Sequence, residues 1–113
     1  MLKIENQKIY LTRGDNAQIT VTVTDTNGVP ISFPDGAEYT IYLTVKRDID
    51  DTTAVISKSA ANTNVISFTP ADTKDLEFGR YVYDIELHYQ NEVHTIVEPH
   101  TFVIGEEVRT NGA

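Results

Sequence analysis

Gly79-Arg80-Tyr81-Val82-Tyr83-Asp84-Ile85-Glu86-Leu87 is the stretch around which the rest of the sequence is organised. Its large apolar residues recur at every second position, while charged residues occupy most of the positions between them. In an extended strand this alternation puts one set on each face, whereas a helix would mix the two sets. The stretch therefore predicts the central strand of a sheet, with Tyr81, Tyr83, Ile85 and Leu87 facing the core.

Length and composition favour one soluble domain. The 113 residues suffice for a single hydrophobic core, and the absence of cysteine excludes disulfides and thiolate metal sites. No run is long and apolar enough to span a membrane, and the first residues lack the apolar stretch of a signal peptide. We expect a β domain over residues 1–105, a loose tail over residues 106–113, and no membrane contact.

The net charge argues against nucleic acid as a partner. The formal charge is −8, and the nine basic residues are scattered, with only Lys46 and Arg47 adjacent. A phosphate backbone needs clustered positive charge, so we expect no nucleic-acid binding.

The remaining pattern predicts short strands separated by turns. Asn27-Gly28 and the Pro30, Pro34 and Gly36 segment mark an irregular connection, and Thr69-Pro70-Ala71-Asp72 opens a single helical turn that runs to about Leu76. The expected strands are a broken first strand (Leu2 to Ile4 with Ile9 to Leu11), Ala17 to Asp25, Ala37 to Lys46, Ala54 to Lys58, Val65 to Phe68, Gly79 to Tyr89, and Val93 to Ile104.

Two details of pairing follow from these expected strands. The strands at Ala54 to Lys58 and Val65 to Phe68 are expected to pair as a hairpin. Pro99 cannot donate a ladder hydrogen bond, so the last strand is bent or bulged there or lies at an edge. Together these features predict an all-β fold, an antiparallel β-sandwich of about seven strands.

The segment Glu77-Phe78-Gly79-Arg80-Tyr81-Val82-Tyr83 resembles the start of the sixth strand of immunoglobulin-like domains. The resemblance puts Tyr81 at the position of the tyrosine corner and Tyr83 where those domains carry a cysteine. It implies an immunoglobulin-like sandwich with no disulfide. It also implies a buried Tyr81 whose hydroxyl bonds to backbone near the turn from Asp72 to Glu77.

A second resemblance covers nearly the whole chain. Ile9 to Asp15, Ala17 to Val21, Asp25 to Pro30 and Gly79 to Ile85, in this order and spacing, resemble the immunoglobulin-like domains of bacteriophage tail and baseplate proteins. The chain is similar in particular to the N-terminal domain family of the siphophage baseplate upper protein.

The second resemblance also carries expectations about function. It implies a virion structural or assembly role in a tail, baseplate or head appendage, with other virion structural proteins as partners. A symmetric homo-oligomer within the particle is compatible with it. The resemblance further implies assembly in the bacterial host cytoplasm, no enzymatic activity and no cofactor.

Three motifs could carry binding chemistry. Arg13-Gly14-Asp15 is the tripeptide read by integrins, but it is also an ordinary turn. The oxygens of Asp48, Asp50 and Asp51 could hold calcium, although the loop lacks the glycine and later glutamate of a calcium loop. His88, His94 and His100 could converge on zinc across the last hairpin, but a turn at Asn91-Glu92 would place His94 on the opposite face from His88. The sequence thus gives no catalytic, cofactor-binding or metal residues that we would assign.

Alternative functions remain open at this point. The chain could be a bacterial surface or secreted immunoglobulin-like adhesion module, or a carbohydrate-binding sandwich, for which Tyr10, Tyr42 and Tyr89 are the candidate aromatic platform. Tyr42, Val82 and the neighbouring threonines could form an outward-facing binding surface. No nucleophile lies beside a histidine in a known motif, and there is no glycine-rich phosphate loop, so catalysis is not expected.

Overall fold

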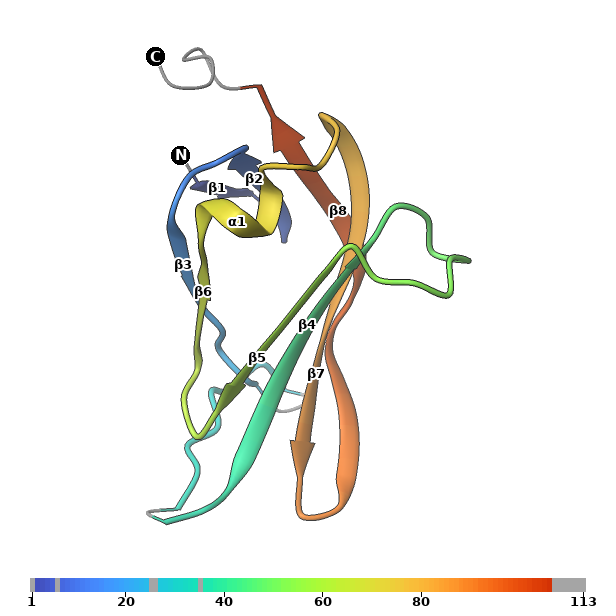
Figure 1. The fold of residues 1–113 in the computed structure, drawn as a ribbon. Helices are drawn as coiled ribbons and strands as arrows, with labels where there is room; N and C mark the ends of the chain where they lie inside the picture. Colours follow the sequence, from blue (N-terminus) through green and yellow to red (C-terminus); the bar gives the residue numbers. More distant parts are fainter. Residues whose placement is uncertain (1, 6, 25–26, 35, 107–113) are drawn as a thin grey trace.

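The computed structural model describes residues 2–5, 7–24, 27–34 and 36–106, which form two layers of β-strands (Figure 1). The larger sheet has six strands, in the order β1 (Leu2–Glu5), β2 (Lys8–Thr12), β8 (Glu92–Gly105), β7 (Gly79–Tyr89), β4 (Tyr39–Lys46) and β5 (Ile56–Ala61). The smaller sheet pairs β3 (Ala17–Thr20) with β6 (Val65–Phe68), and the single turn of helix α1 (Pro70–Thr73) follows β6. The predicted all-β architecture is confirmed.

The core lies between the two sheets and is made by the period-two faces of the strands. Phe68 of the small sheet packs against Phe102 of the large one, with ring centroids 5.9 Å apart. Each large side chain buried in this way contributes about 1.5–3 kcal/mol. The other buried apolar residues are Ile9, Leu11, Ile19, Val21, Val23, Ile41, Leu43, Val45, Ile56, Ala60, Ile66, Tyr81, Tyr83, Ile85, Leu87 and Ile104.

Strand β7 matches its predicted bounds and its predicted place inside the sheet. It pairs antiparallel with β4 on one side and with β8 on the other. Its odd-numbered residues from Tyr81 to Leu87 are buried, and the even-numbered ones are intermediate or exposed. The alternation works as a fold signal because a strand inside a two-layer protein meets the core on one face only.

Tyr81 is buried as predicted, and its hydroxyl donates a hydrogen bond to the carbonyl of Glu77 at 2.8 Å. The bond joins β7 to the segment that follows α1. Two residues along the same face, the hydroxyl of Tyr83 donates to the carbonyl of Gln7. Because Gln7 lies in the turn between β1 and β2, this second bond fastens the N-terminal hairpin to the central strand.

Two predictions about the first strands are corrected. The expected broken first strand is instead a hairpin, in which β1 pairs antiparallel with β2 after a turn at Gln7, whose φ is +67°. The expected strand from Ala17 to Asp25 pairs only over Ala17–Thr20. Val21 and Val23 stay buried, but β6 begins at Val65, and beyond Thr20 the Val21 amide bonds instead to the carbonyl of Asn64, at 2.8 Å. Asp25 lies outside the described residues.

The predicted hairpin between Ala54 to Lys58 and Val65 to Phe68 is wrong. β5 pairs with β4 in the large sheet, whereas β6 crosses over and pairs with β3. The crossing turns at Asn62, whose φ is +59°, and is fixed by Asn64. Asn64 donates from Nδ2 to the carbonyl of Val21 at 2.9 Å and accepts from the hydroxyl of Tyr39 at 2.7 Å. The two strands are therefore neighbours in sequence that belong to different layers.

The last strand is bulged near Pro99, as predicted. Tyr83 lies opposite His100, Ile85 opposite Val97, and Glu86 opposite Thr95, so β8 carries extra residues between these pairs. Near its end, residues 102–105 of β8 pair with β2 in parallel, a departure from the expected purely antiparallel fold. Glu106 is exposed after β8, and the rest of the expected tail lies outside the described residues.

Candidate functional site

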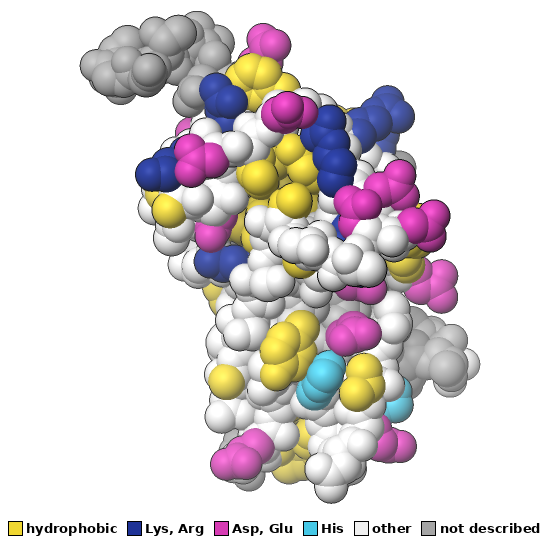
Figure 2. All heavy atoms as spheres, turned by 45° about the vertical axis from the view of Figure 1, so that its right-hand side comes forward, with side chains coloured by type: hydrophobic (Ala, Val, Ile, Leu, Met, Phe, Trp, Pro, Cys, Tyr) yellow, Lys and Arg dark blue, Asp and Glu magenta, His cyan; other side chains and the backbone are white. Residues whose placement is uncertain are grey.

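An apolar patch lies on the outer face of the large sheet, and we call Tyr42, His88 and Val93 the outer-face patch. The ring of Tyr42 on β4 lies 4.4 Å from that of His88 on β7, and His88 is paired in register with Val93 on β8. Tyr42 is 40% exposed and Val93 57%. Glu86 lies 3.3 Å from Nε2 of His88 and orients the ring. In the lower part of Figure 2 a histidine is flanked by hydrophobic side chains on this side of the molecule.

A shallow hollow of about 220 Å³ lies higher on the same face, beside the bulge of β8. Its lining includes Ile49, Val82 and Pro99 together with the charged side chains of Lys46 and Asp84. Burial raises the pKa of Asp84, and the nearby Glu86 carboxylate raises it further, while Lys46 acts in the opposite direction. The hollow mixes apolar and charged groups, which is typical of the rim of a protein contact.

A larger hollow of about 540 Å³ lies at the end of the sandwich near the β7–β8 turn. It is lined by Phe33, Leu87 and Tyr89, among others. Phe33 stacks on Tyr39 with centroids 4.0 Å apart and meets Tyr89 edge-on at 5.1 Å. The sequence indicated only an irregular connection here. A lone aromatic between Pro30 and Pro34 was the available signal that this connection folds back onto the sheet.

The Arg13-Gly14-Asp15 segment is held by intramolecular contacts. Arg13 donates from Nη1 to the carbonyl of Leu76 at 3.3 Å, and its guanidinium lies 4.1 Å from the ring centroid of Phe78. The amide of Gly14 donates to Oγ1 of the fully buried Thr73 at 2.8 Å. These contacts support the interpretation of a turn that anchors α1 and the segment after it to the end of β2.

The acidic loop after β4 uses its carboxylates on its own backbone. The Asp48 carboxylate accepts from the amide of Asp50 at 3.2 Å, and Asp51 accepts from the amide of Asp48 at 3.1 Å. Within the described ranges, no three His, Asp or Glu side chains lie close enough together to hold a metal ion.

The three histidines do not converge. The β7–β8 turn consists of Gln90 and Asn91, so His94 pairs with Leu87 and not with Tyr89 as expected. His94 is still on the opposite face from His88, because a shift of two residues conserves the face. His100 contacts the carbonyl of Glu98 through Nδ1 at 2.7 Å. The bulges of β8 separate His100 further from the other two.

The proposed tyrosine platform is not formed either. Tyr42 projects from the outer face of the large sheet, whereas Tyr89 faces inward and contacts Phe33. Tyr10 lies on β2, with β8 and β7 between it and the strand of Tyr42. Three tyrosines on different faces and distant strands cannot stack on one sugar.

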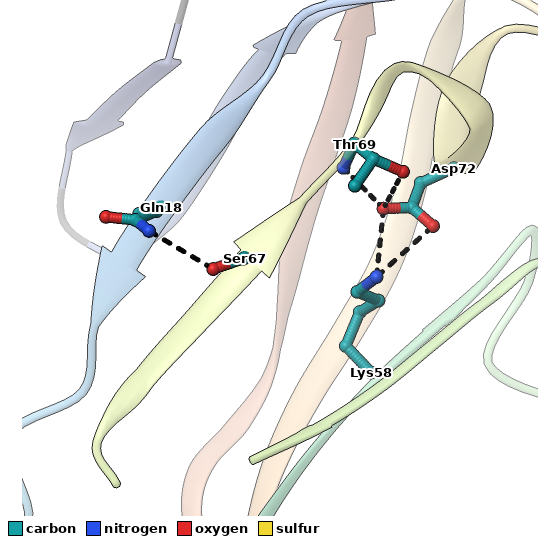
Figure 3. Close-up of polar contacts among 5 residues, drawn as sticks. All are labelled: Gln18, Lys58, Ser67, Thr69 and Asp72. Carbon is teal, nitrogen blue, oxygen red and sulfur yellow. Dashed lines mark hydrogen bonds and ion pairs between the residues drawn. The ribbon is translucent and has the colours of Figure 1, made fainter.

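Lys58 and Asp72 form a contact that sequence reasoning missed. Figure 3 shows Lys58 reaching from β5 to the Asp72 carboxylate on α1, with Nζ 3.1 Å and 3.3 Å from its two oxygens. The same carboxylate accepts from the amide of Thr69 at 2.7 Å. Burial raises the pKa of Asp72, but these hydrogen bonds and the Lys58 charge outweigh it, and the net shift is downward. Figure 3 also shows Gln18 bonded to Ser67 across β3 and β6, at 3.3 Å.

The outer-face patch and the two hollows offer surface for contact with another molecule, and the edges of the sheets offer main-chain amides and carbonyls. No helix in the described part of the chain is both long and apolar enough to cross a membrane. No protein-family model and no curated protein matches this chain.

Proposed function

We propose that this chain is an immunoglobulin-like module of a bacteriophage or prophage virion, located in a tail, baseplate or head appendage. Its function is assembly through contacts with other virion proteins, and it performs no catalysis. The sequence resemblance to tail and baseplate domains motivates the proposal. The proposed location of the chain is the assembled virion particle.

The observation that carries the immunoglobulin-like part is the arrangement of five strands around the tyrosine corner. Immunoglobulin domains place their third, sixth and seventh strands in one sheet and their second and fifth in the other. Here β4, β7 and β8 are neighbours in the large sheet, and β3 pairs with β6 in the small one. The Tyr81 hydroxyl bonds backward to the Glu77 carbonyl, as a tyrosine corner does.

The contact role is supported by the outer face of the large sheet. The outer-face patch and the hollow beside Pro99 lie on one side of the molecule and combine exposed apolar groups with charged ones. Such a mixture suits an interface whose centre is aromatic and whose rim is polar. The outer-face patch lies on strands, and so does most of the lining of the hollow, with Ile49 of the loop after β4 as the exception.

Proteomics of purified particles tests the proposal. Virions banded from the source culture should contain peptides of this chain in a fixed ratio to the major structural proteins, and abundant host cytoplasmic proteins should be depleted. The matched control is the cell-wall and secreted fraction of the same culture. Finding the chain there and not in particles would favour the adhesion alternative and refute the virion role.

A further inference from the structure

Strand β5 presents an open main-chain edge. The amide of Asn62 donates to the carbonyl of Tyr39 at 2.8 Å, in the same register as the β4–β5 ladder. Ladder bonds alternate along an antiparallel pair, so residues 56, 58 and 60 bond to β4. The amides and carbonyls of Ser57, Ser59 and Ala61 therefore point away from β4, toward a side where the described residues supply no neighbouring strand.

This edge is the longest regular one in the described fold. β5 pairs with β4 over six residues without a register shift. By contrast β1, β3 and β6 have four residues each, and the free part of β8 carries two register shifts and Pro99. Exposed edges are normally protected by proline, bulges or outward charges. The exposed side chains of Ser57, Ser59 and Ala61 provide none of these.

Lys58, the one charged residue of β5, does not protect the edge from pairing with another strand. Lys58 points to the inner side of the sheet, and its ammonium is already bonded to Asp72 of the same chain. An inward lysine can prevent edge pairing when its charge has no partner. Here the charge has a partner on α1, so strand addition would bury no unpaired ammonium.

We propose that β5 is a self-association edge, at which a second copy of this chain adds its own β5 antiparallel across a twofold axis at Ser59. In this register Ser59 lies opposite Ser59, and Ser57 lies opposite Ala61 of the second copy. Each outward pair exchanges two bonds, which gives about six main-chain hydrogen bonds. The two large sheets become one continuous sheet.

The positions of the charged side chains and the twofold symmetry of the pairing favour a second copy of this chain as the partner at the β5 edge. The segment Ser57-Lys58-Ser59-Ala60-Ala61 pairs with itself so that Lys58 lies opposite Ala60, and no like charges face each other across the ladder. A twofold contact uses the same patch on both copies, which this register satisfies. The inference rests on the β5 edge alone and holds whether or not the chain belongs to a virion.

The contact is small, and this sets the expected behaviour. Stable interfaces bury roughly 1,200–2,000 Å², more than two strands of six residues supply. The dimer should therefore form reversibly as concentration rises, and sedimentation velocity from about 10 μM to about 1 mM should show a monomer–dimer shift. Hydrogen exchange in the same series should show new protection at the amides of Ser57, Ser59 and Ala61.

A charge-swap experiment tests the register. Ser59→Lys and Ser59→Asp each place like charges directly opposite across the axis, so each should raise the dimer dissociation constant by at least about tenfold. An equimolar mixture should associate again, because lysine then faces aspartate. Thr95→Lys, an exposed site on β8, is the matched control for net charge and should dimerise like the wild type.

Circular dichroism and thermal melts establish that each variant is folded. Three results would each overturn the proposal: a wild-type chain that remains monomeric at about 1 mM, a Ser59→Lys chain that dimerises like the wild type, or a charge mixture that fails to associate. Concentration-dependent association without protection of the three β5 amides would also overturn it and would place the contact elsewhere.

Discussion

Replacing Tyr81 with phenylalanine removes one hydroxyl and the hydrogen bond that joins β7 to the segment after α1. The ring stays buried, and its contact with the Arg47 guanidinium, 4.8 Å from the ring centroid, is available to phenylalanine as well. The loss is therefore that of one hydrogen bond, about 0.5–1.5 kcal/mol. Glu77 is exposed, so its carbonyl can regain a water molecule, which keeps the cost near about 1 kcal/mol rather than the larger penalty of a sealed acceptor.

Urea unfolding followed by tyrosine fluorescence or circular dichroism measures this loss. With a slope of about 1–3 kcal/mol per molar, the midpoint of Tyr81→Phe should fall by about 0.3–1 M with the slope unchanged. Tyr42→Phe is the matched control, because that hydroxyl makes no hydrogen bond within the described residues and its loss should leave the midpoint in place. Equal midpoints for Tyr81→Phe and the wild type would refute the assignment of a stabilising corner.

Three further outcomes are expected. The folded state lowers the pKa of Asp72 below the ordinary 3.8, so its contribution to stability is complete above that pH and is lost as the pH falls through the lower folded value. Asp72→Asn should therefore destabilise the protein at neutral pH and flatten the fall of its melting temperature in acid, and an unchanged acid limb would contradict this. Asn64→Ala leaves the Tyr39 hydroxyl and the Val21 carbonyl without their partner and should cost about 1–3 kcal/mol in urea unfolding. Asn64→Asp keeps the acceptor for Tyr39 but turns a carboxylate oxygen toward the Val21 carbonyl, so it should not recover this loss. Thermal melts with and without a chelator should coincide, and a shift of several degrees would count against a metal-free fold.

The strands that could be predicted are those in which every second side chain is buried in the core along the whole length of the strand. Gly79–Tyr89 and the strand ending at Lys46 follow the sequence pattern because each lies inside the large sheet and packs on the core throughout. Tyr81 was predictable for a different reason. Its spacing from Gly79 belongs to a local turn geometry that a short motif can encode.

The pairings could not be predicted, because the period of a strand does not specify its neighbour. Ile56–Ala61 and Val65–Phe68 have the spacing of a hairpin, yet Asn62 and Asn64 divert the chain into the other layer. Val21 and Val23 continue the alternation of buried side chains although the β3–β6 ladder ends at Thr20. A side chain is buried by the facing sheet, whereas a ladder needs a neighbouring strand in the same sheet, so the sequence pattern of burial does not show where a ladder ends. The Lys58–Asp72 contact could not be predicted because it joins β5 to α1, and the period of a strand does not show what packs over it.

Sequence alternation correctly puts Tyr42 and Val82 on outward faces, but it does not say which side chains lie next to them. Outward positions such as Tyr42 and His88 are far apart in the chain and become neighbours only through the register of β4 and β7. The open edge of β5 is a property of strand order. Until β5 is known to be the last strand of its sheet, Ser57 and Ser59 are two ordinary polar residues.

The parallel pairing of β2 with β8 determines when the molecule can finish folding. Ile9 meets Phe102, so residues about ninety positions apart must come together, and closing so long a loop is slow. During synthesis, the β1–β2 hairpin emerges well before β8, and β2 has no parallel partner until residues 102–105 have been made. Ile9 and Leu11, fully buried in the finished fold, therefore lack this partner strand until β8 has been made, and premature termination before Phe102 would leave them without it permanently.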